Sequence, residues 1–99
     1  MIKLRISEEA FADLDEGFWF YEAQEVGLGD YFAVSLRAEI EGLRISAGIH
    51  RRVYLDYHRL LARVFPFSIF YTFEDDEVVV WAVIDGRRDP EWIRRHLGE

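Results

Sequence analysis

Seven consecutive apolar residues, Val78 to Ile84, constrain the fold of this chain more than any other feature. The run is far shorter than the roughly 20 residues that span a bilayer. Its branched side chains favour a strand, so we expect a buried strand over residues 77–84 with Trp81 at its centre. Just beyond this strand lie Arg87 and Arg88. The chain therefore directs two arginines out of the end of its most apolar strand, and any proposed function must account for them.

Three further segments have the alternation of polar and apolar residues that is typical of half-buried strands: residues 2–7, 59–64 and 67–74. Pro66 separates the second from the third because proline has no backbone N–H to donate to a sheet. The pair Asp75-Asp76 forms a tight turn before the last strand. We therefore expect the last three strands to form an antiparallel meander, with the first strand joining the sheet at an edge.

Helices are predicted between the first two strands and at the end of the chain. Ser7 is a good N-cap, and the apolar residues that follow it at spacings of three and four make one helical face that extends to about Glu25. A second helix, capped by Asp30, runs to about Gly48, and a short third helix covers residues 90–97. The sequence thus predicts an α+β fold in a single domain of residues 1–99. Its parts are an N-terminal strand, an antiparallel helical hairpin packed on one face of an antiparallel β-sheet, and a short C-terminal helix.

The composition of the chain limits the cellular location, the metal sites and the kinds of partner that we expect for it. The chain has no cysteine, which excludes disulfides and thiolate metal sites, and its three histidines lack the spacing of metal ligands, so we expect no metal and no cofactor. Its beginning has no leader-like segment, and no stretch is long enough to span a membrane, so we expect a cytoplasmic protein. A net charge of −7 argues against direct binding to nucleic acid, although eight arginines fall within residues 51–99.

Six side chains are candidates for binding a target or a partner protein: Arg59, Arg63, Phe70, Arg87, Arg88 and Trp92. The strand periodicity and the position of the last two arginines predict that all four arginines converge on one side of the sheet. They are either solvated and paired with the many acids of the chain, or presented to the carboxylates of a partner or to the target. Phe70 falls on the more polar side of its strand. It is either a stray core aromatic or part of an uncovered docking surface.

Three segments in this order resemble a known family: "YEAQEVGLGDYF" at the helix joint, "RLLARVFPFSIFY" across the middle strands, and "VVVWAVIDGRRDPEWIRRHL" at the end. Together they are similar to the RelE/ParE superfamily of type II toxins, in its ParE-like, plasmid-stabilisation branch. The resemblance covers nearly the whole chain. It implies a toxin that is neutralised by a cognate antitoxin protein, in a toxin-antitoxin hetero-oligomer.

The resemblance also bears on enzymatic activity. RelE-type members cleave mRNA on the ribosome with an arginine on the middle strand, an arginine after the last strand and a C-terminal tyrosine. In this chain the first position falls at Ser68 and the tyrosine position at Trp92, so only Arg87 or Arg88 matches. Serine carries no charge and indole is no general acid or base. The resemblance therefore favours a ParE-like inhibitor of DNA gyrase over the two alternatives, a RelE-like mRNA endonuclease and a degenerate member that only binds its antitoxin.

Overall fold

A computed structural model gives the fold of the chain and describes residues 1–98. Its elements in chain order are β1 (Lys3–Ile6), α1 (Glu8–Glu22), α2 (Leu28–Glu41), α3 (Leu43–Ser46), β2 (Arg52–Tyr54), β3 (Tyr57–Leu61), β4 (Phe67–Glu74), β5 (Glu77–Asp85) and α4 (Pro90–His96). None of the helices among these residues is long and apolar enough to cross a membrane.

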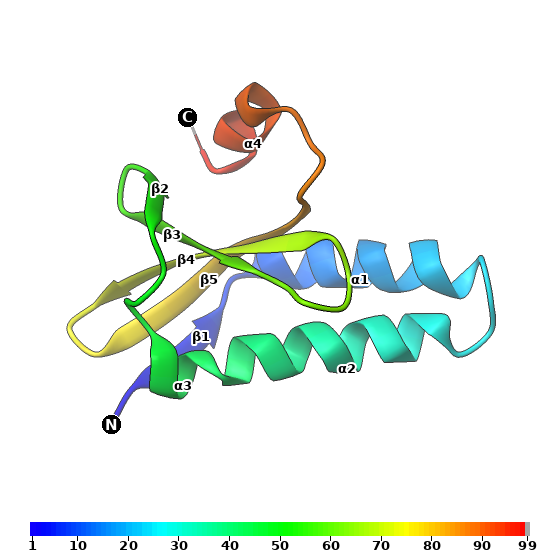
Figure 1. The fold of residues 1–99 in the computed structure, drawn as a ribbon, viewed down its shortest axis with the longest axis horizontal. Coiled ribbons are helices and arrows are strands. Elements are labelled where there is room, and N and C mark those ends of the chain that lie inside the picture. Colours follow the sequence, from blue (N-terminus) through cyan, green and yellow to red (C-terminus); the bar gives the residue numbers. More distant parts are fainter. Residues whose placement is uncertain (99) are drawn as a thin grey trace.

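A five-stranded sheet in the order β1-β5-β4-β3-β2 forms the centre of the fold. The helical hairpin of α1 and α2 covers one face of the sheet, and α4 lies on the other side (Figure 1). The predicted architecture is confirmed, including the edge position of the first strand. The sheet is mixed, however, because β1 pairs parallel with β5, whereas β5, β4, β3 and β2 pair antiparallel. The second helix was predicted to run to about Gly48, but α2 ends at Glu41 and the separate short helix α3 follows it. The sequence did not predict β2.

The joint between α1 and α2 differs from the prediction in how it is capped. Ser7 caps α1 as expected, since its Oγ accepts a hydrogen bond from the Ala10 N–H at 3.0 Å. The second helix begins at Leu28, before Asp30, after a left-handed Gly27 with φ of 93°. The predicted cap at Asp30 is therefore wrong. The carboxylate of Glu22, at the end of α1, accepts hydrogen bonds from the N–H groups of Gly27 and Gly29 instead.

The main core lies between the hairpin and the sheet. Its fully buried members include Phe32, Leu36 and Ile40 of α2, with Tyr71 of β4 and Val80 of β5 on the sheet side. These residues recur at helical spacing on α2, and their strand partners face the same layer. The apolar periodicity of the sequence therefore identified the buried face of α2, whereas on α1 Phe11, which belongs to the expected apolar face, is 46 % exposed.

A register shift between β4 and β5 changes the place of Trp81. Phe70 is opposite Ala82 and Tyr71 is opposite Val80, so Trp81 is left without a direct partner, as in a β-bulge. Its side chain is half-buried, its Nε1–H donates to Thr72 Oγ1 at 2.9 Å, and the guanidinium of Arg5 lies 5.8 Å from its ring centre. Trp81 thus lies outside the main core, contrary to the expectation from its central position in the strand.

Helix α4 covers part of the outer sheet face. Leu97, which follows the helix, is in a second apolar cluster with Phe70, Ala82 and Ile84, against which Trp92 also packs. Phe70 is only 2 % exposed. The expectation that Phe70 lies on an uncovered face is therefore wrong, because the C-terminal helix folds back over it.

Candidate functional site at the end of strand β5

The turn after β5 fixes Arg87 in one orientation. The Arg88 N–H donates to the carbonyl of Asp85 at 3.1 Å, which closes the turn. Within it, Nε and Nη2 of Arg87 donate to the two carboxylate oxygens of Asp85 at 3.0 and 2.7 Å. These hydrogen bonds hold the pKa of Asp85 below its usual range. The Arg87 side chain remains 72 % exposed, so the pair presents an oriented guanidinium to the surroundings.

Arg88 lies over the ring of Trp92, with its guanidinium carbon 4.3 Å from the ring centre. The other neighbour of the indole is His96, whose ring stacks on it at 4.9 Å with an angle of 10° between the planes. Asp89 places these side chains, because its carboxylate accepts from the Glu91 N–H and so caps α4, with Pro90 in the first turn. The arrangement is a cation, an indole and an imidazole in one column.

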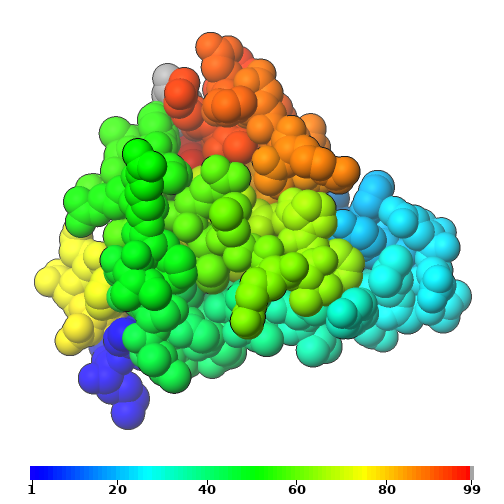
Figure 2. Space-filling view, viewed as in Figure 1, coloured from blue at the N-terminus to red at the C-terminus, as the bar shows by residue number. Residues whose placement is uncertain are grey.

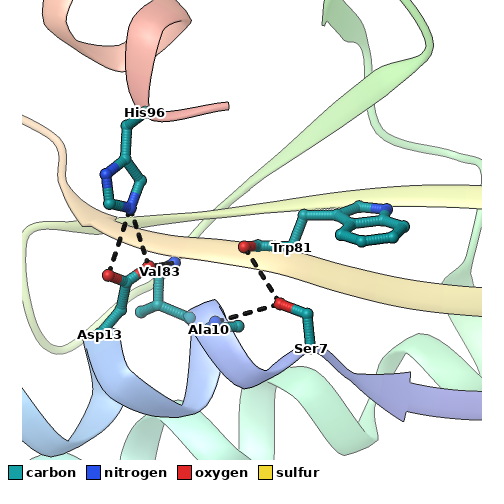
Figure 3. Close-up of polar contacts among 6 residues, drawn as sticks. All are labelled: Ser7, Ala10, Asp13, Trp81, Val83 and His96. Atoms are coloured by element: carbon teal, nitrogen blue, oxygen red, sulfur yellow. Dashed lines mark hydrogen bonds and ion pairs between the residues drawn. The ribbon is translucent and has the colours of Figure 1, made fainter. Parts of the chain in front are cut away.

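The column ends on a carboxylate of α1. His96 Nε2 lies 3.3 Å from one oxygen of Asp13, and the other oxygen accepts from the Val83 N–H at 2.9 Å (Figure 3). Burial raises the pKa of Asp13, and the Val83 N–H and His96 partly offset that effect. The same view shows Ser7 donating to the carbonyl of Trp81, so α1 contacts β5 at two points. Asp13 therefore ties α1, β5 and α4 together.

A cavity of about 190 Å³ lies between α1 and α4. Phe20, Ile84 and Trp92 contribute apolar walls, and Glu16 and Arg88 contribute charge. The cavity can accept an apolar side chain while a guanidinium and a carboxylate lie beside it. Apolar walls with charged side chains beside them are features of the pockets that hold anchor side chains in protein interfaces.

Arg59 reaches the same end of β5 from β3. Its Nε donates to Ser68 Oγ at 2.9 Å, and Ser68 is completely buried. A Cβ at Gly86 would lie 3.4 Å from Ser68 Oγ and 3.8 Å from Nη2 of Arg59, which are ordinary contact distances, so the guanidinium of Arg59 lies next to the β5 turn. A fixed cation from the neighbouring strand thus lies against the serine.

The sequence prediction correctly places some, but not all, of the predicted site residues next to one another. Arg59, Arg87 and Arg88 gather around the end of β5, together with Trp92. Arg63 does not join them, because its N–H and its Nε bond to Glu39 of α2 at 2.8 and 3.5 Å. The predicted convergence of four arginines is therefore wrong for Arg63. Sequence reasoning also missed Asp13, which is 83 residues from its partner His96 and carries no local signal of that contact.

No metal centre is formed in the part of the chain that the structure describes: residues 1–98 contain no cluster of three or more histidine, cysteine or acidic side chains suited to one ion. The arrangement at the end of β5 offers oriented cations, an indole and an apolar cavity. This chemistry suits binding of carboxylates and apolar side chains.

Comparisons with known proteins define the class. The chromosomal ParDE toxin-antitoxin system from P. aeruginosa contains a chain with a TM-score of 0.79 and 18 % identity, over 86 % of this chain and 96 % of that one. The isolated E. coli RelE toxin has a TM-score of 0.64 and 17 % identity, over 96 % and 95 % of the two chains. The intact E. coli RelBE complex gives 0.64 and 18 %, over 89 % and 100 %. The fold is therefore that of the RelE/ParE superfamily.

The family can be stated more closely. The family described as the ParE toxin of the type II toxin-antitoxin system, parDE, matches residues 4–90. The chain belongs to this ParE toxin family, which confirms the resemblance read from the sequence. No curated protein sequence matches the chain significantly.

Proposed function

We propose that this chain is the toxin of a parDE-type pair, that it inhibits DNA gyrase by binding it, and that a cognate antitoxin neutralises it. The observation that carries the proposal is the chemistry and the surroundings of Ser68 and Trp92. The resemblance places the nuclease arginine and tyrosine at these two positions. Ser68 is buried under Arg59, and Trp92 is held between Arg88 and His96. Serine has no permanent charge with which to stabilise a phosphate, and the indole of tryptophan cannot act as a general acid or base.

The nuclease alternative rests on one feature of the site. The guanidinium of Arg59 lies against Ser68 and so puts a positive charge next to the position that an arginine would occupy. A positive charge alone stabilises a phosphate anion but does not move a proton. The imidazole of the column, His96, has its Nε2 3.3 Å from the Asp13 carboxylate and one ring face against Trp92, so its Nε2 is not presented to a substrate. The site therefore favours binding over phosphodiester cleavage.

The proposed antitoxin contact includes the exposed guanidinium of Arg87 and the Arg88–Trp92 pair beside the cavity. A partner carboxylate would bind the N–H groups of Arg87 that do not bond to Asp85, and an apolar neighbour that excludes water strengthens such a pair. The similar ParDE and RelBE chains come from toxin-antitoxin systems, which supports a partner of this kind. We also propose that the protein acts in the cytoplasm, where gyrase is found.

The proposed pair is tested by expressing the chain with and without the product of an adjacent reading frame. Expression of the chain alone should arrest growth, and co-expression of the antitoxin should restore it. Arg87→Ala and Arg88→Ala should each weaken the purified complex by about 1–3 kcal/mol, mainly through faster dissociation.

Arg63→Ala is the matched control, since Arg63 is equally a surface arginine but pairs with Glu39 away from the β5 turn. Its complex should keep full affinity. Equal losses in all three variants would show that the arginines act only through net charge, and full affinity in Arg87→Ala and Arg88→Ala would remove the β5 turn from the interface.

A further inference from the structure

Helix α4 carries Trp92, a central part of the candidate site, at the margin of the fold. Together with the turn before it, in orange and red, the helix forms the top of the molecule (Figure 2). None of its seven residues is buried, and Trp92 packs only partly against the second apolar cluster. A helix of this length is not stable alone, so contacts with other elements must hold its side chains in place.

The carboxylate of Asp13, on α1, is bonded to the backbone of the sheet. Strand β1 ends at Ile6, opposite Val80, so β5 has no strand partner on that side at Val83. There Asp13 Oδ2 accepts a hydrogen bond from the Val83 N–H at 2.9 Å. The Asp13 side chain is only 15 % exposed, and it cannot follow a movement of α4 without losing this hydrogen bond. Asp13 is therefore a fixed point against which α4 can be held.

Three contacts lead from this carboxylate to a cation of the site. His96 Nε2 lies 3.3 and 3.4 Å from the two oxygens of Asp13 (Figure 3). The imidazole lies nearly parallel to the Trp92 ring at 4.9 Å, and the guanidinium carbon of Arg88 lies 4.3 Å from the centre of the same indole. Asp13, Arg88 and Trp92 also line the same cavity. Displacement of the imidazole would therefore remove the support from one side of the indole on which Arg88 lies.

Arg88 depends on this indole for its orientation. Arg87 is held by the carboxylate of Asp85, whereas Arg88 forms no ion pair within residues 1–98. We propose that Asp13 is a positioning residue of the site: through His96 and Trp92 it holds the Arg88 guanidinium beside the cavity, ready to bind a carboxylate of the antitoxin. This inference rests on the proposed function for the identity of the partner.

Ser7 provides a matched control that separates positioning from a general effect on stability. Its Oγ donates to the carbonyl of Trp81 at 3.3 Å and accepts from the Ala10 N–H, so it also joins α1 to β5. The polar contacts of Ser7 do not include α4. Ser7→Ala should therefore destabilise the chain through loss of the cap and of this contact, and leave Arg88 in place.

The first part of the test is NMR of the free full chain labelled with ¹³C and ¹⁵N. The ring current of Trp92 should move the side-chain resonances of Arg88 upfield in the parent chain, and Trp92→Ala gives their values without the ring. Asp13→Ala and His96→Ala should each bring these resonances at least halfway to the Trp92→Ala values. His96→Ala alters only the exposed end of α4 and keeps the test decisive if Asp13→Ala does not fold. Ser7→Ala should keep the parent resonances.

The second part is a double-mutant cycle in the binding of the purified antitoxin, taken as the product of the adjacent reading frame. Asp13→Ala should weaken the complex by about five- to twentyfold, a range expected within one interaction network. In the Arg88→Ala background the same substitution should have almost no further effect, because the guanidinium that Asp13 positions is absent. Ser7→Ala should leave the affinity unchanged.

Two outcomes would overturn the inference. The first is a set of Arg88 resonances that stays at the parent values in Asp13→Ala or in His96→Ala. The second is a loss of affinity from Asp13→Ala that simply adds to the loss from Arg88→Ala. A parent chain that binds no antitoxin, while the Arg88 resonances move as expected, would contradict the proposed function and still identify Asp13 as the positioning residue.

Discussion

Gly17 shows how a single position depends on its tertiary neighbours. It lies inside α1, where glycine normally costs about 0.5–1 kcal/mol relative to alanine. A Cβ at this position, however, would meet the ring of Phe32 at 2.4 Å, and Phe32 is fully buried. The close approach of α1 to α2 thus depends on the missing side chain.

We predict that Gly17→Ala destabilises the protein by about 1–3 kcal/mol, the usual cost of overpacking a core, despite the better helix propensity of alanine. Denaturant unfolding followed by fluorescence measures this. Gly42→Ala is the control, because Gly42 is exposed, has an ordinary φ of −60° and faces only backbone oxygens at 3.3 Å or more. Its free energy of unfolding should change by no more than about 0.5 kcal/mol. A stabilised Gly17→Ala variant would contradict the described packing.

The surroundings of Trp81 could not be predicted from its own strand alone. The run from Val78 to Ile84 correctly predicted a strand and its burial. The bulge that turns Trp81 outward depends on the register against β4, which a single strand does not encode. The prediction for Phe70 was wrong in the opposite direction. Phe70 was placed on an uncovered face but is buried, because α4, which is remote in the sequence, covers it.

At the scale of elements, the segment before β2 is held by a cluster of two histidines and a tyrosine. The Tyr71 hydroxyl accepts from the Gly48 N–H at 3.1 Å, and it lies 2.6 Å from His50 Nδ1. His58 stacks on the Tyr71 ring, and its Nδ1 lies 2.7 Å from the carbonyl of His50. Burial raises the pKa of Tyr71, so the hydroxyl keeps its proton and can donate it to a neutral His50.

This cluster predicts an acid-sensitive stability. The pKa of His50 lies below its ordinary value of 6.5. Burial makes the largest contribution to this decrease and the electrostatic effect of His58 the second largest, while Glu39 acts in the opposite direction. The unfolded state therefore binds the proton more tightly. The stabilisation is fully present above pH 6.5, falls as the pH decreases through 6.5 toward the lower pKa of the folded state, and changes no further below it.

Chemical denaturation between pH 5 and pH 8 measures the effect. The free energy of unfolding should decrease toward pH 5 in the parent chain, and the slope should be smaller in His50→Gln, which keeps a polar side chain but does not titrate. Identical slopes in both proteins would mean that His50 does not contribute to the pH dependence.

The elements also show how far the sequence could be used for prediction. Periodicity located the hairpin, the meander and the last helix, although α2 ends at Glu41 rather than near Gly48 and lacks the predicted cap at Asp30. The cap of α2 by Glu22, the pairing of Arg63 with Glu39 and the contact of Asp13 with His96 all join residues from different elements. Such contacts form only when the elements pack, so no local pattern of the sequence predicts them. The sequence therefore identified Arg87, Arg88 and Trp92 as candidate site residues, but it did not identify Asp13, through which the site contacts α1.

At the scale of the whole molecule, charge is divided among surfaces. Residues 8–41, which form the hairpin, hold ten acids and one base, whereas residues 43–64 hold five arginines and one acid. The acidic hairpin disfavours contact with nucleic acid and with acidic peptides, so a partner with carboxylates would be directed to the arginine-bearing parts of the chain. A toxin that binds proteins rather than nucleic acid is consistent with this division.

The supercoiling of relaxed plasmid DNA by purified gyrase tests the central claim most directly. We predict that the purified chain inhibits supercoiling, that the antitoxin restores it, and that translating ribosomes incubated with the same preparation keep their mRNA intact. Codon-specific mRNA cleavage that is lost in Arg59→Ala, with gyrase activity unaffected by the chain, would contradict the account and identify the protein as a ribosome-dependent nuclease.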